Sequence, residues 1–311
     1  MASIQWYPGH MTRTNRQLAE SIKQVDIVVE ILDARIPASS RNPEIDKMLS
    51  TRQRLVALNK SDLADAAVSS AWKRWYQQNN IDAVFTDSKT GAGLEAIKAA
   101  LKRIGSEKVK KHAEKGVVHR SVRAMIVGIP NSGKSTLINK LAGKATAKTG
   151  DRPGVTRAKQ WIRLEGGIDL LDTPGILWPK FEDEKVARNL AFTGAIKDEI
   201  MDTVELSEQL LTILLTSYPQ FLEKRYSLVA ATVSQVTEPA SETDLVEGVL
   251  DVPGLETEPE ALKFPLLSQV GKRRGFLVHG GKIDIMRAAA MVLDEFRSSK
   301  IGRISLERPD E

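Results

Sequence analysis

A glycine-rich motif near the middle of the chain has the residue types and spacing needed to hold phosphate groups. Residues 128–135 read Gly-Ile-Pro-Asn-Ser-Gly-Lys-Ser, which fits the pattern G-x-x-x-x-G-K-S/T. In such a loop, backbone N–H groups surround the phosphates, the lysine neutralises their oxygens, and the serine hydroxyl binds Mg²⁺. The predicted phosphate-binding residues are Gly128, Ile129, Pro130, Asn131, Ser132, Gly133, Lys134, Ser135 and Thr136.

Two later segments add groups that suit a metal ion and a terminal phosphate. Asp172-Thr-Pro-Gly175 follows an apolar run, so that its carboxylate can accept a Mg²⁺-bound water and Gly175 can approach the γ-phosphate. Thr156, in a Pro-Gly turn between the two motifs, offers one more hydroxyl. We therefore predict Ser135, Thr156 and Asp172 as magnesium ligands, and Lys134 and Thr156 as catalytic residues for attack of water on the γ-phosphate.

A base-reading motif, Asn59-Lys60-Ser-Asp62, comes earlier in the chain. The Asp62 carboxylate can accept two N–H donors from guanine, whereas adenine lacks them and would leave the carboxylate unpaired. Asn59 is expected to hold the base edge and the loop. The motif therefore favours GTP over ATP.

Asp87-Ser88-Lys89 stands where other GTPases have Ser-Ala-Lys beside the guanine carbonyl, although its first residue departs from that pattern. We expect the guanine contact to come mainly from backbone N–H groups near Ser88.

These motifs occur in the reverse of their usual order, with the base-reading segments before the phosphate loop. The carboxyl ends of parallel strands meet at one edge of a sheet, so a chain cut and rejoined elsewhere keeps the same site. The sequence thus predicts a circularly permuted nucleotide-binding fold. The segment after Gly175 would then lead directly into the C-terminal region and could transmit the state of the γ-phosphate to it.

The elements that position these motifs alternate between strands and helices. Short apolar or β-branched runs predict strands, and helical patterns such as 92–104 and 135–141 separate most of them. The predicted fold class is α/β, with a doubly wound, mostly parallel sheet followed by a small all-α domain. The predicted strands are 25–32, 55–58, 83–86, 125–127 and 168–171.

Two domains are expected from the length of 311 residues. Residues 1–178 would form the nucleotide-binding domain, and 179–311 a helical domain with a final helix near 284–298. Residues 102–123 hold eight Lys or Arg against two Glu and are expected to form an exposed basic connector.

Charge is distributed unevenly along the chain. Residues 238–260 contain eight acidic residues and no Lys or Arg, and their three prolines predict a surface insertion. Outside that segment 45 basic residues face 32 acidic ones, a net charge of +13. Such a charge suits a polyanion, for which nucleic acid is the common cytosolic candidate, and it also suits a simply solvated surface.

The chain contains no cysteine, no run of eighteen apolar residues and no signal-peptide pattern at its start. We expect a cytoplasmic protein without disulfides and without a membrane partner.

Taken with these motifs, the chain resembles the YlqF family of circularly permuted ribosome-assembly GTPases over nearly its whole length. The resemblance includes Trp6-Tyr-Pro-Gly-His10-Met, the segment 33–43 after the first strand, and Gly271-Lys-Arg-Arg-Gly275. It also includes His279-Gly-Gly-Lys282-Ile-Asp, whereas the acidic insertion has no counterpart in the family pattern. The family implies a role in maturation of the large ribosomal subunit, with a C-terminal RNA-binding domain and no DNA partner.

The resemblance also implies roles for two polar residues. Many GTPases have a water-orienting glutamine after the Asp-Thr-Pro-Gly glycine, but Ile176 stands here, and the family points to His10 instead. A histidine after Pro-Gly can also brace a turn. Asn131 resembles the K⁺-coordinating asparagine of potassium-activated relatives, or is a plain polar loop residue.

Basic side chains around the last predicted helix are the expected RNA contacts, with a solvated cationic face as the alternative. For the whole chain, an RNA-binding scaffold with a structural nucleotide and a signalling GTPase remain alternatives to a ribosome-assembly GTPase. The predicted RNA contacts are Lys272, Arg273, Arg274, Lys282, Arg287, Arg297, Lys300 and Arg303.

Overall fold

The computed structural model divides the chain into two compact units, residues 1–197 with 303–311 and residues 198–302. The first boundary lies later than predicted, and the last residues of the chain return to the first unit. The described residues are 18–49, 52–114, 120–143, 160–173, 175, 177–178, 181, 183–229 and 263–309.

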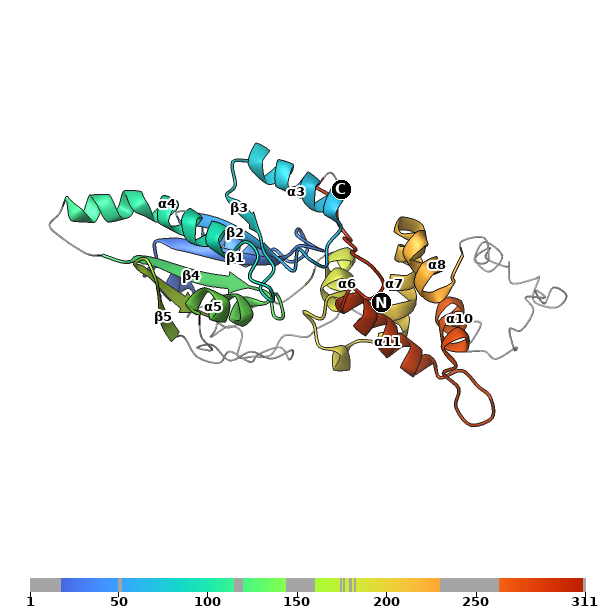
Figure 1. Cartoon of the computed structure of the whole chain (residues 1–311). Coiled ribbons are helices and arrows are strands. Elements are labelled where there is room, and N and C mark those ends of the chain that lie inside the picture. Colours follow the sequence, from blue (N-terminus) through green and yellow to red (C-terminus); the bar gives the residue numbers. More distant parts are fainter. Residues whose placement is uncertain are drawn as a thin grey trace. The chain divides into compact units, whose positions relative to one another are not determined.

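A six-stranded sheet forms the centre of the first unit, in the order β3-β2-β1-β4-β6-β5 (Figure 1). All but β5 run parallel, as predicted for a doubly wound sheet. The parallel strands are β1 (Ile27–Asp33), β2 (Gln53–Asn59), β3 (Ala83–Phe85), β4 (Val122–Gly128) and β6 (Ile168–Asp172).

The edge strand β5 (Gln160–Leu164) pairs antiparallel with β6 and was not predicted. Only two of its five residues, Ile162 and Leu164, are buried, so it lacks the continuous apolar run of the inner strands. Inner strands such as β1, buried along its whole length, carry that signal.

Helices cover both faces of the sheet (Figure 1). On one face α4 (Leu94–Ala113) and α5 (Lys134–Ala142) bury Ile97, Leu101, Leu137 and Ile138 against the strands. The other face packs against the helical turn 18–22, α2 (Pro43–Met48) and α3 (Ala66–Gln78).

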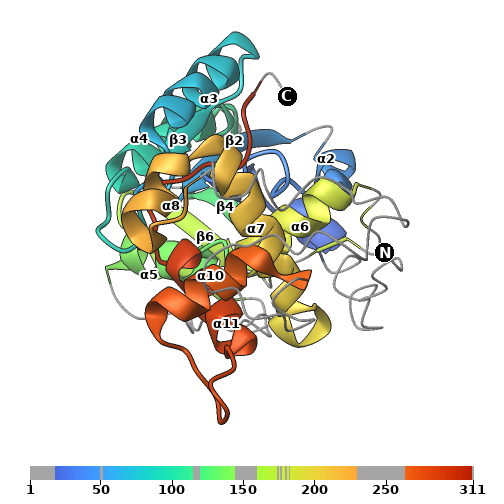
Figure 2. The same ribbon diagram turned by 90° about the vertical axis from the view of Figure 1, so that its right-hand side faces the viewer.

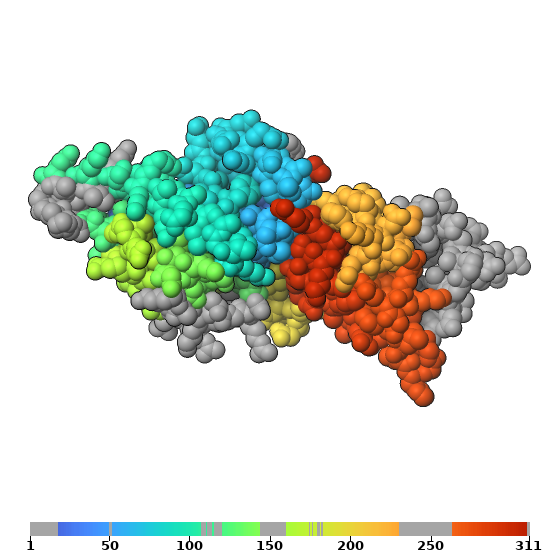
Figure 3. All heavy atoms as spheres, viewed as in Figure 1, coloured from blue at the N-terminus to red at the C-terminus, as the bar shows by residue number. Residues whose placement is uncertain are grey.

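The outer surfaces of α3 and α4 are drawn in blue-green in Figure 3. The first half of the predicted basic connector lies in α4, which continues through Ala113, nine residues beyond the predicted helix end at Ile104. The exposed side chains of Lys102 and Arg103 are therefore helical. The expected exposure is confirmed at Lys102, Arg103 and Lys110, but the predicted helix end at Ile104 was wrong, because charged residues on a solvated face do not end a helix.

The second unit is helical, as predicted for the C-terminal region. Ser207 of α7 donates a hydrogen bond to the carbonyl of Ala289 in α11, and α10 packs beside α11 (Figure 2). The predicted final helix is confirmed, with the Asp284 side chain capping its first turn. Among its described residues, the elements are the 3₁₀ turn Asp198–Ile200, α7 (Thr203–Ser217), α8 (Pro219–Tyr226), α10 (Pro265–Arg274) and α11 (Ile285–Arg297).

A buried carboxylate, Glu295, links α11 to α8. It accepts hydrogen bonds from Arg225 Nε at 2.8 Å and from the Tyr226 hydroxyl at 2.8 Å.

The predicted acidic insertion 238–260 lies outside the described residues. Within the described part of the chain, no helix has the length and apolar character needed to cross a bilayer.

One further helix, α6 (Glu184–Phe192), belongs to the first unit although we predicted it for the second domain. Its buried Asn189 donates hydrogen bonds to Ser39 Oγ at 3.1 Å and to Glu307 Oε1 at 3.0 Å. These partners are far away in sequence, so the local helical pattern after Trp178 could not indicate the boundary.

Candidate nucleotide-binding site

The predicted site residues gather at one edge of the sheet because they end neighbouring parallel strands. Asn59 ends β2, Asp87 follows β3, Gly128 ends β4 and Asp172 ends β6. Since β1 lies between β2 and β4, it separates a base-reading side from a phosphate side. The reversed motif order therefore produces one continuous site.

Asn59 joins the base-reading side to the phosphate loop. Its amide Nδ2 donates to the carbonyl of Ser132 at 2.8 Å, and its Oδ1 accepts from Ser88 Oγ at 2.7 Å and from Thr86 Oγ1 at 3.2 Å. A Cβ added at Gly133, whose φ is +94°, would lie 2.2 Å from Nδ2. The glycine therefore leaves room for the contact between the two motifs, and the amide holds the two loops together.

Backbone N–H groups of the segment after β3 donate hydrogen bonds to side chains of the chain itself. The N–H of Ser88 donates to Asn59 Oδ1 at 3.1 Å, and the N–H of Lys89 donates to Asp87 Oδ1 at 2.8 Å. Both N–H groups are engaged within the chain in this structure, and the guanine contact through backbone N–H groups near Ser88 stays a prediction.

The Asp87 carboxylate shapes the turn that follows β3. It accepts hydrogen bonds from the Lys89 backbone and from Thr90 Oγ1, at 2.6 Å from the hydroxyl. Burial favours a higher pKa for Asp87, but these hydrogen bonds outweigh it and lower the pKa below the usual range. An aspartate in place of the usual serine thus stabilises the loop.

Lys60 is anchored by a carboxylate from β1. Its Nζ lies 3.0 Å from Asp33 Oδ2, and Asp33 also pairs with Arg35 at 2.8 Å. Burial alone would raise the pKa of Asp33, but the charges of Arg35 and Lys60 and the hydrogen bonds from Arg35 lower it far below its usual range. Burial lowers the pKa of Lys60 against the opposing effect of Asp33. The side chain of Asp62, two residues on, is exposed and accessible to a base.

The phosphate loop has the backbone of a cradle around an anion. Lys134 Nζ donates to the carbonyl of Ile129 at 2.6 Å, and Ser132 Oγ donates to the same carbonyl at 2.9 Å. Asn131 has a left-handed φ of +55°, and its Nδ2 donates to the carbonyl of Gly194 at 2.7 Å. The loop thus curls around the Lys134 ammonium and is attached to the turn after α6.

Lys134 and Asp172 form a buried charged pair without a direct salt bridge. Burial lowers the pKa of Lys134 to about 8, although the charge of Asp172 opposes that shift. Burial raises the pKa of Asp172 to about 6, opposed by Lys134. Asp172 Oδ1 is buried without a hydrogen-bond partner among the described residues. A buried oxygen left unpaired is costly, so this side of the site is arranged for a ligand.

Gly175 lies against the phosphate loop. A Cβ at this position would lie 2.8 Å from Lys134 Nζ and 3.0 Å from Pro130. Only a residue without a side chain fits there without displacing the lysine. The predicted residues His10, Thr156 and Ile176 lie outside the described residues.

Comparison with known proteins agrees with this geometry. A family model described as a 50S ribosome-binding GTPase matches residues 123–236. Ribosome biogenesis GTPase A of Priestia megaterium is 45% identical, over 99% of this chain and 98% of the relative. The chain belongs to the ribosome biogenesis GTPase A family. It is a GTP hydrolase of the circularly permuted YlqF type.

Other members extend the similarity over the full length. Ribosome biogenesis GTPase A of Thermotoga maritima is 29% identical over 99% of this chain and 95% of the relative. A crystal structure described as GNP-bound YlqF from T. maritima aligns with a TM-score of 0.63 and 26% identity, covering 96% of this chain and 99% of that one. This match supports the α/β GTPase fold and the helical C-terminal region together.

The predicted RNA contacts of this GTPase fall into different surroundings. Arg297 pairs with Asp198 at 2.7 Å, and Arg287 lies over the Phe276 ring at 4.4 Å. Arg303 belongs to the first unit, where it donates to backbone carbonyls of residues 61 and 64. The remaining exposed cations are Lys272, Arg273, Arg274, Lys282 and Lys300.

Proposed function

We propose that this GTPase binds the immature large ribosomal subunit through rRNA in its GTP-bound form, promotes late assembly and leaves after hydrolysis. The observation that carries the proposal is the full-length similarity to ribosome biogenesis GTPases, together with a family model described as 50S ribosome-binding. The permuted order supports a link between the bound nucleotide and docking on the subunit, because the segment after Gly175 continues into the C-terminal region.

Lys134 has the central chemical role in this proposal. Its ammonium, which donates to the Ile129 carbonyl in this structure, would turn to the β- and γ-phosphate oxygens. The buried Lys134 ammonium would then stabilise the charge that develops on the transferring phosphoryl group. Electrostatic stabilisation is strong in a site that excludes water. Binding of an anion also relieves the cost of burying Lys134, so its depressed pKa would rise.

Mg²⁺ fits the donors on the phosphate side of the site. Asp172 Oδ1, unpartnered among the described residues, is a hard oxygen acceptor of the kind that Mg²⁺-bound water needs. Ser135 is the second residue of α5 and follows Lys134 in the phosphate-loop motif. When bound, Mg²⁺ would neutralise charge on the phosphate oxygens. We propose Ser135, Asp172 and the predicted Thr156 as the residues that hold it.

K⁺ is a second proposed cofactor, with Asn131 as its ligand. The Asn131 side chain is held in the phosphate loop by its bond to the Gly194 carbonyl. Hydrolysis by the wild type should then be faster in KCl than in NaCl at equal ionic strength. An Asn131→Ser variant should lose that difference, and equal rates of the wild type in both salts would remove K⁺ from the proposal.

His10 is the proposed water-orienting residue, on the family resemblance and because Ile176 carries no polar group. Basal turnover should be slow and should rise when ribosomal subunits are added. The variant His10→Ala should lose stimulated turnover and keep its affinity for GTP. Full stimulation of that variant would return His10 to a structural role.

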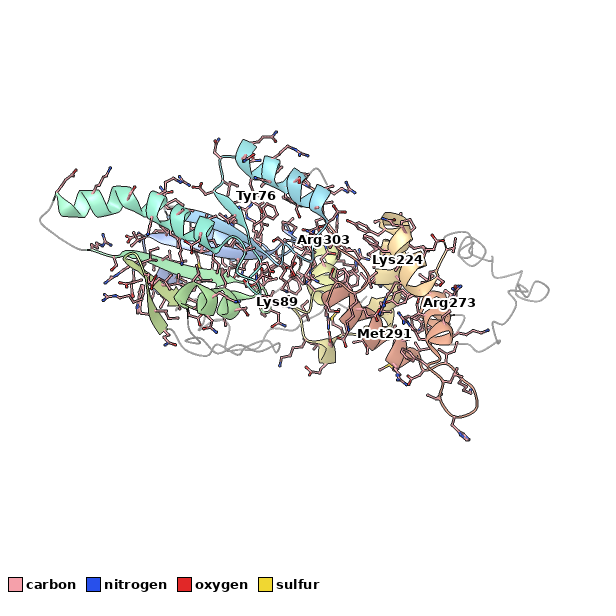
Figure 4. The ribbon with its side chains drawn as sticks, in the orientation of Figure 1. Tyr76, Lys89, Lys224, Arg273, Met291 and Arg303 are labelled. Carbon is pink, nitrogen blue, oxygen red and sulfur yellow. The ribbon has the colours of Figure 1, made fainter. Side chains whose placement is uncertain are left out.

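Cations at the end of α10 are the proposed rRNA contacts. Lys272, Arg273 and Arg274 form its last turn, and Arg273 is labelled in Figure 4. The following loop carries exposed Lys282 and positive-φ glycines at 280 and 281, which allow close approach to a phosphate backbone. Arg303 is omitted from this cluster because its guanidinium is bound to carbonyls of the first unit.

A binding experiment with salt dependence tests the docking proposal. Replacing Lys272, Arg273 and Arg274 by Ala should weaken binding to immature large subunits and flatten the fall of affinity with salt. Arg274 lies 3.9 Å from Glu295 and over the Tyr226 ring, so the double variant Lys272→Ala/Arg273→Ala avoids disturbing that contact. A matched control removes the exposed cations Lys73 and Arg74 of α3.

Three outcomes separate the proposal from its alternatives. Weaker docking with unchanged GTP affinity in the cluster variants, and not in the control, supports rRNA contact. Equal docking by all variants at every salt concentration would show a solvated surface. Docking that is the same with GDP and with a non-hydrolysable GTP analogue would instead favour the RNA-binding scaffold, with nucleotide as a structural ligand.

A further inference from the structure

Residues Arg303–Glu307, near the end of the chain, form a segment that packs into the GTPase unit. They follow Gly302, the last residue of the helical unit, without a linker. Ile304, Ser305 and Glu307 are buried. We refer to residues 303–307 as the C-terminal segment.

This segment contacts the loop that carries the base-reading aspartate. Arg303 donates from Nη2 to the carbonyl of Ser61 at 2.9 Å and from Nε to the carbonyl of Ala64 at 2.8 Å. The Ile304 N–H donates to the carbonyl of Leu63 at 3.0 Å. Three carbonyls on both sides of Asp62 are thus held by two adjacent residues of the segment.

The 61–64 loop is also held by hydrogen bonds of the residues at its two ends. Ser305 Oγ accepts a hydrogen bond from the Asp65 N–H at 3.1 Å, next to the start of α3. The Ser61 N–H donates to the Thr86 carbonyl at 3.1 Å. The backbone on either side of Asp62 is fixed by these bonds, whereas the Asp62 side chain itself stays exposed.

A second anchor fixes the segment where it ends. The buried Glu307 carboxylate accepts from the N–H of Ala38 at 2.7 Å and of Ser39 at 3.0 Å, and from Asn189 Nδ2 at 3.0 Å. The Trp72 indole donates to the Glu307 carbonyl at 3.1 Å. A buried carboxylate that accepts several hydrogen bonds is costly to move away from its donors. The C-terminal segment is therefore held at both ends, by Arg303 at its start and by Glu307 at its end.

We propose that Arg303, labelled in Figure 4, is a positioning residue for guanine recognition that holds the 61–64 loop so that Asp62 meets the base. Two hydrogen bonds from guanine to one carboxylate demand a defined direction as well as a distance. A loop that moves loses both bonds, but it keeps the phosphate contacts made from β4 and β6. The inference rests on the proposed role of Asp62 in reading guanine.

Affinities for GDP and for inosine diphosphate, which lacks the 2-amino group of guanine, test this role. In the full-length protein, Arg303→Ala should bind GDP about ten-fold more weakly, the size of effect expected for lost hydrogen bonds from a charged donor. Inosine diphosphate should lose less, so that the preference for GDP over inosine diphosphate shrinks. Arg303→Lys, which can still donate to one carbonyl, should recover part of that preference.

Controls separate positioning from general damage. Arg103→Ala removes a mostly exposed arginine of the same unit and should change neither affinity. Asp62→Asn, measured with guanine and xanthine nucleotides, tests the underlying assignment separately. An unchanged preference for GDP over inosine diphosphate in Arg303→Ala, whether both affinities hold or fall together, would overturn the proposal. If Arg303→Ala does not fold, the same ratio measured in Arg303→Lys decides it.

Discussion

The base side and the phosphate side of this site differ in how their polar groups are paired. On the base side, Asn59 uses both ends of its amide on other parts of the chain, and Lys60 is paired with Asp33. On the phosphate side, Lys134 and Asp172 are buried with their pKa values shifted towards neutrality, to about 8 and about 6. The chain itself completes the base side, whereas a ligand must complete the phosphate side.

This difference explains how one site can be selective and still respond to nucleotide. A base-reading loop that is already ordered spends no binding energy on ordering itself, so that energy can serve to discriminate between bases. A phosphate side with unmatched charge gains most when phosphate arrives, which suits a device that must distinguish GTP from GDP.

The largest expected effect comes from changing the base-reading carboxylate alone. Asp62→Asn should reverse the preference between GTP and xanthosine triphosphate by about 10⁴-fold, because an amide presents a donor where guanine also presents one. The xanthine nucleotide should bind the variant about as tightly as GTP binds the wild type, since the phosphate side is untouched. Competition binding with both nucleotides measures this, and unchanged GTP affinity would remove the Asn59–Asp62 assignment.

On the phosphate side, Lys134→Met should lower the hydrolysis rate by about 10²- to 10³-fold. The nucleotide-free variant should melt at the same temperature as the wild type or higher, because burying a charge without its ligand is costly. Single-turnover rates and thermal melts measure the two quantities. Lys140→Met, on an exposed position of the same helix, is the control. A variant that hydrolyses normally would contradict the role of Lys134.

Loss of the Asp33 anchor should destabilise the folded chain. Asp33→Asn should lower the free energy of unfolding by about 3 kcal/mol, because Arg35 and Lys60 lose a buried partner. The pKa of Asp33 is lowered in the folded state, so its contribution is full above the unfolded pKa of about 3.9 and falls as pH drops through the folded pKa.

Urea unfolding at several pH values measures this contribution. The difference between wild type and variant should be constant from neutral pH down to about 5 and shrink only below about 4. Asp169→Asn, in an exposed pair with Arg163, should cost less than about 1 kcal/mol. Similar losses in both variants would show that the Asp33 cluster is not a special anchor.

The smallest effect on stability is expected from breaking the Asn59–Ser132 hydrogen bond, which connects the base side to the phosphate loop. Asn59→Asp keeps the oxygen that accepts from Ser88 and Thr86 but turns the donor to Ser132 into an acceptor. Leaving one buried carbonyl unpaired should cost about 1 to 3 kcal/mol in stability and weaken GDP binding. Ser88→Ala, which removes one donor to the same amide and leaves the Ser132 bond intact, should cost less. Equal losses of stability in both variants would show that the Asn59–Ser132 hydrogen bond makes no special contribution.

Much of this arrangement was predictable because it is local. Continuous apolar runs predicted the parallel strands, and the glycine pattern predicted the loop that curls around Lys134. The double use of the Asn59 amide was not predictable, since its partners Ser88 and Ser132 lie 29 and 73 residues away. The return of Arg303 to the 61–64 loop was missed for the same reason, and an arginine near a basic helix was interpreted as an RNA contact.

Hydrogen exchange at the two sides, with and without GDP and Mg²⁺, tests the comparison most directly. Amides of residues 59–65 should already be protected in the nucleotide-free protein, because they bond to Thr86, Lys60 and Ser305. Amides of residues 128–136 should gain most of their protection only when nucleotide binds. Unprotected exchange at 59–65 without nucleotide, with gains on binding as large as those at 128–136, would contradict a preformed base side.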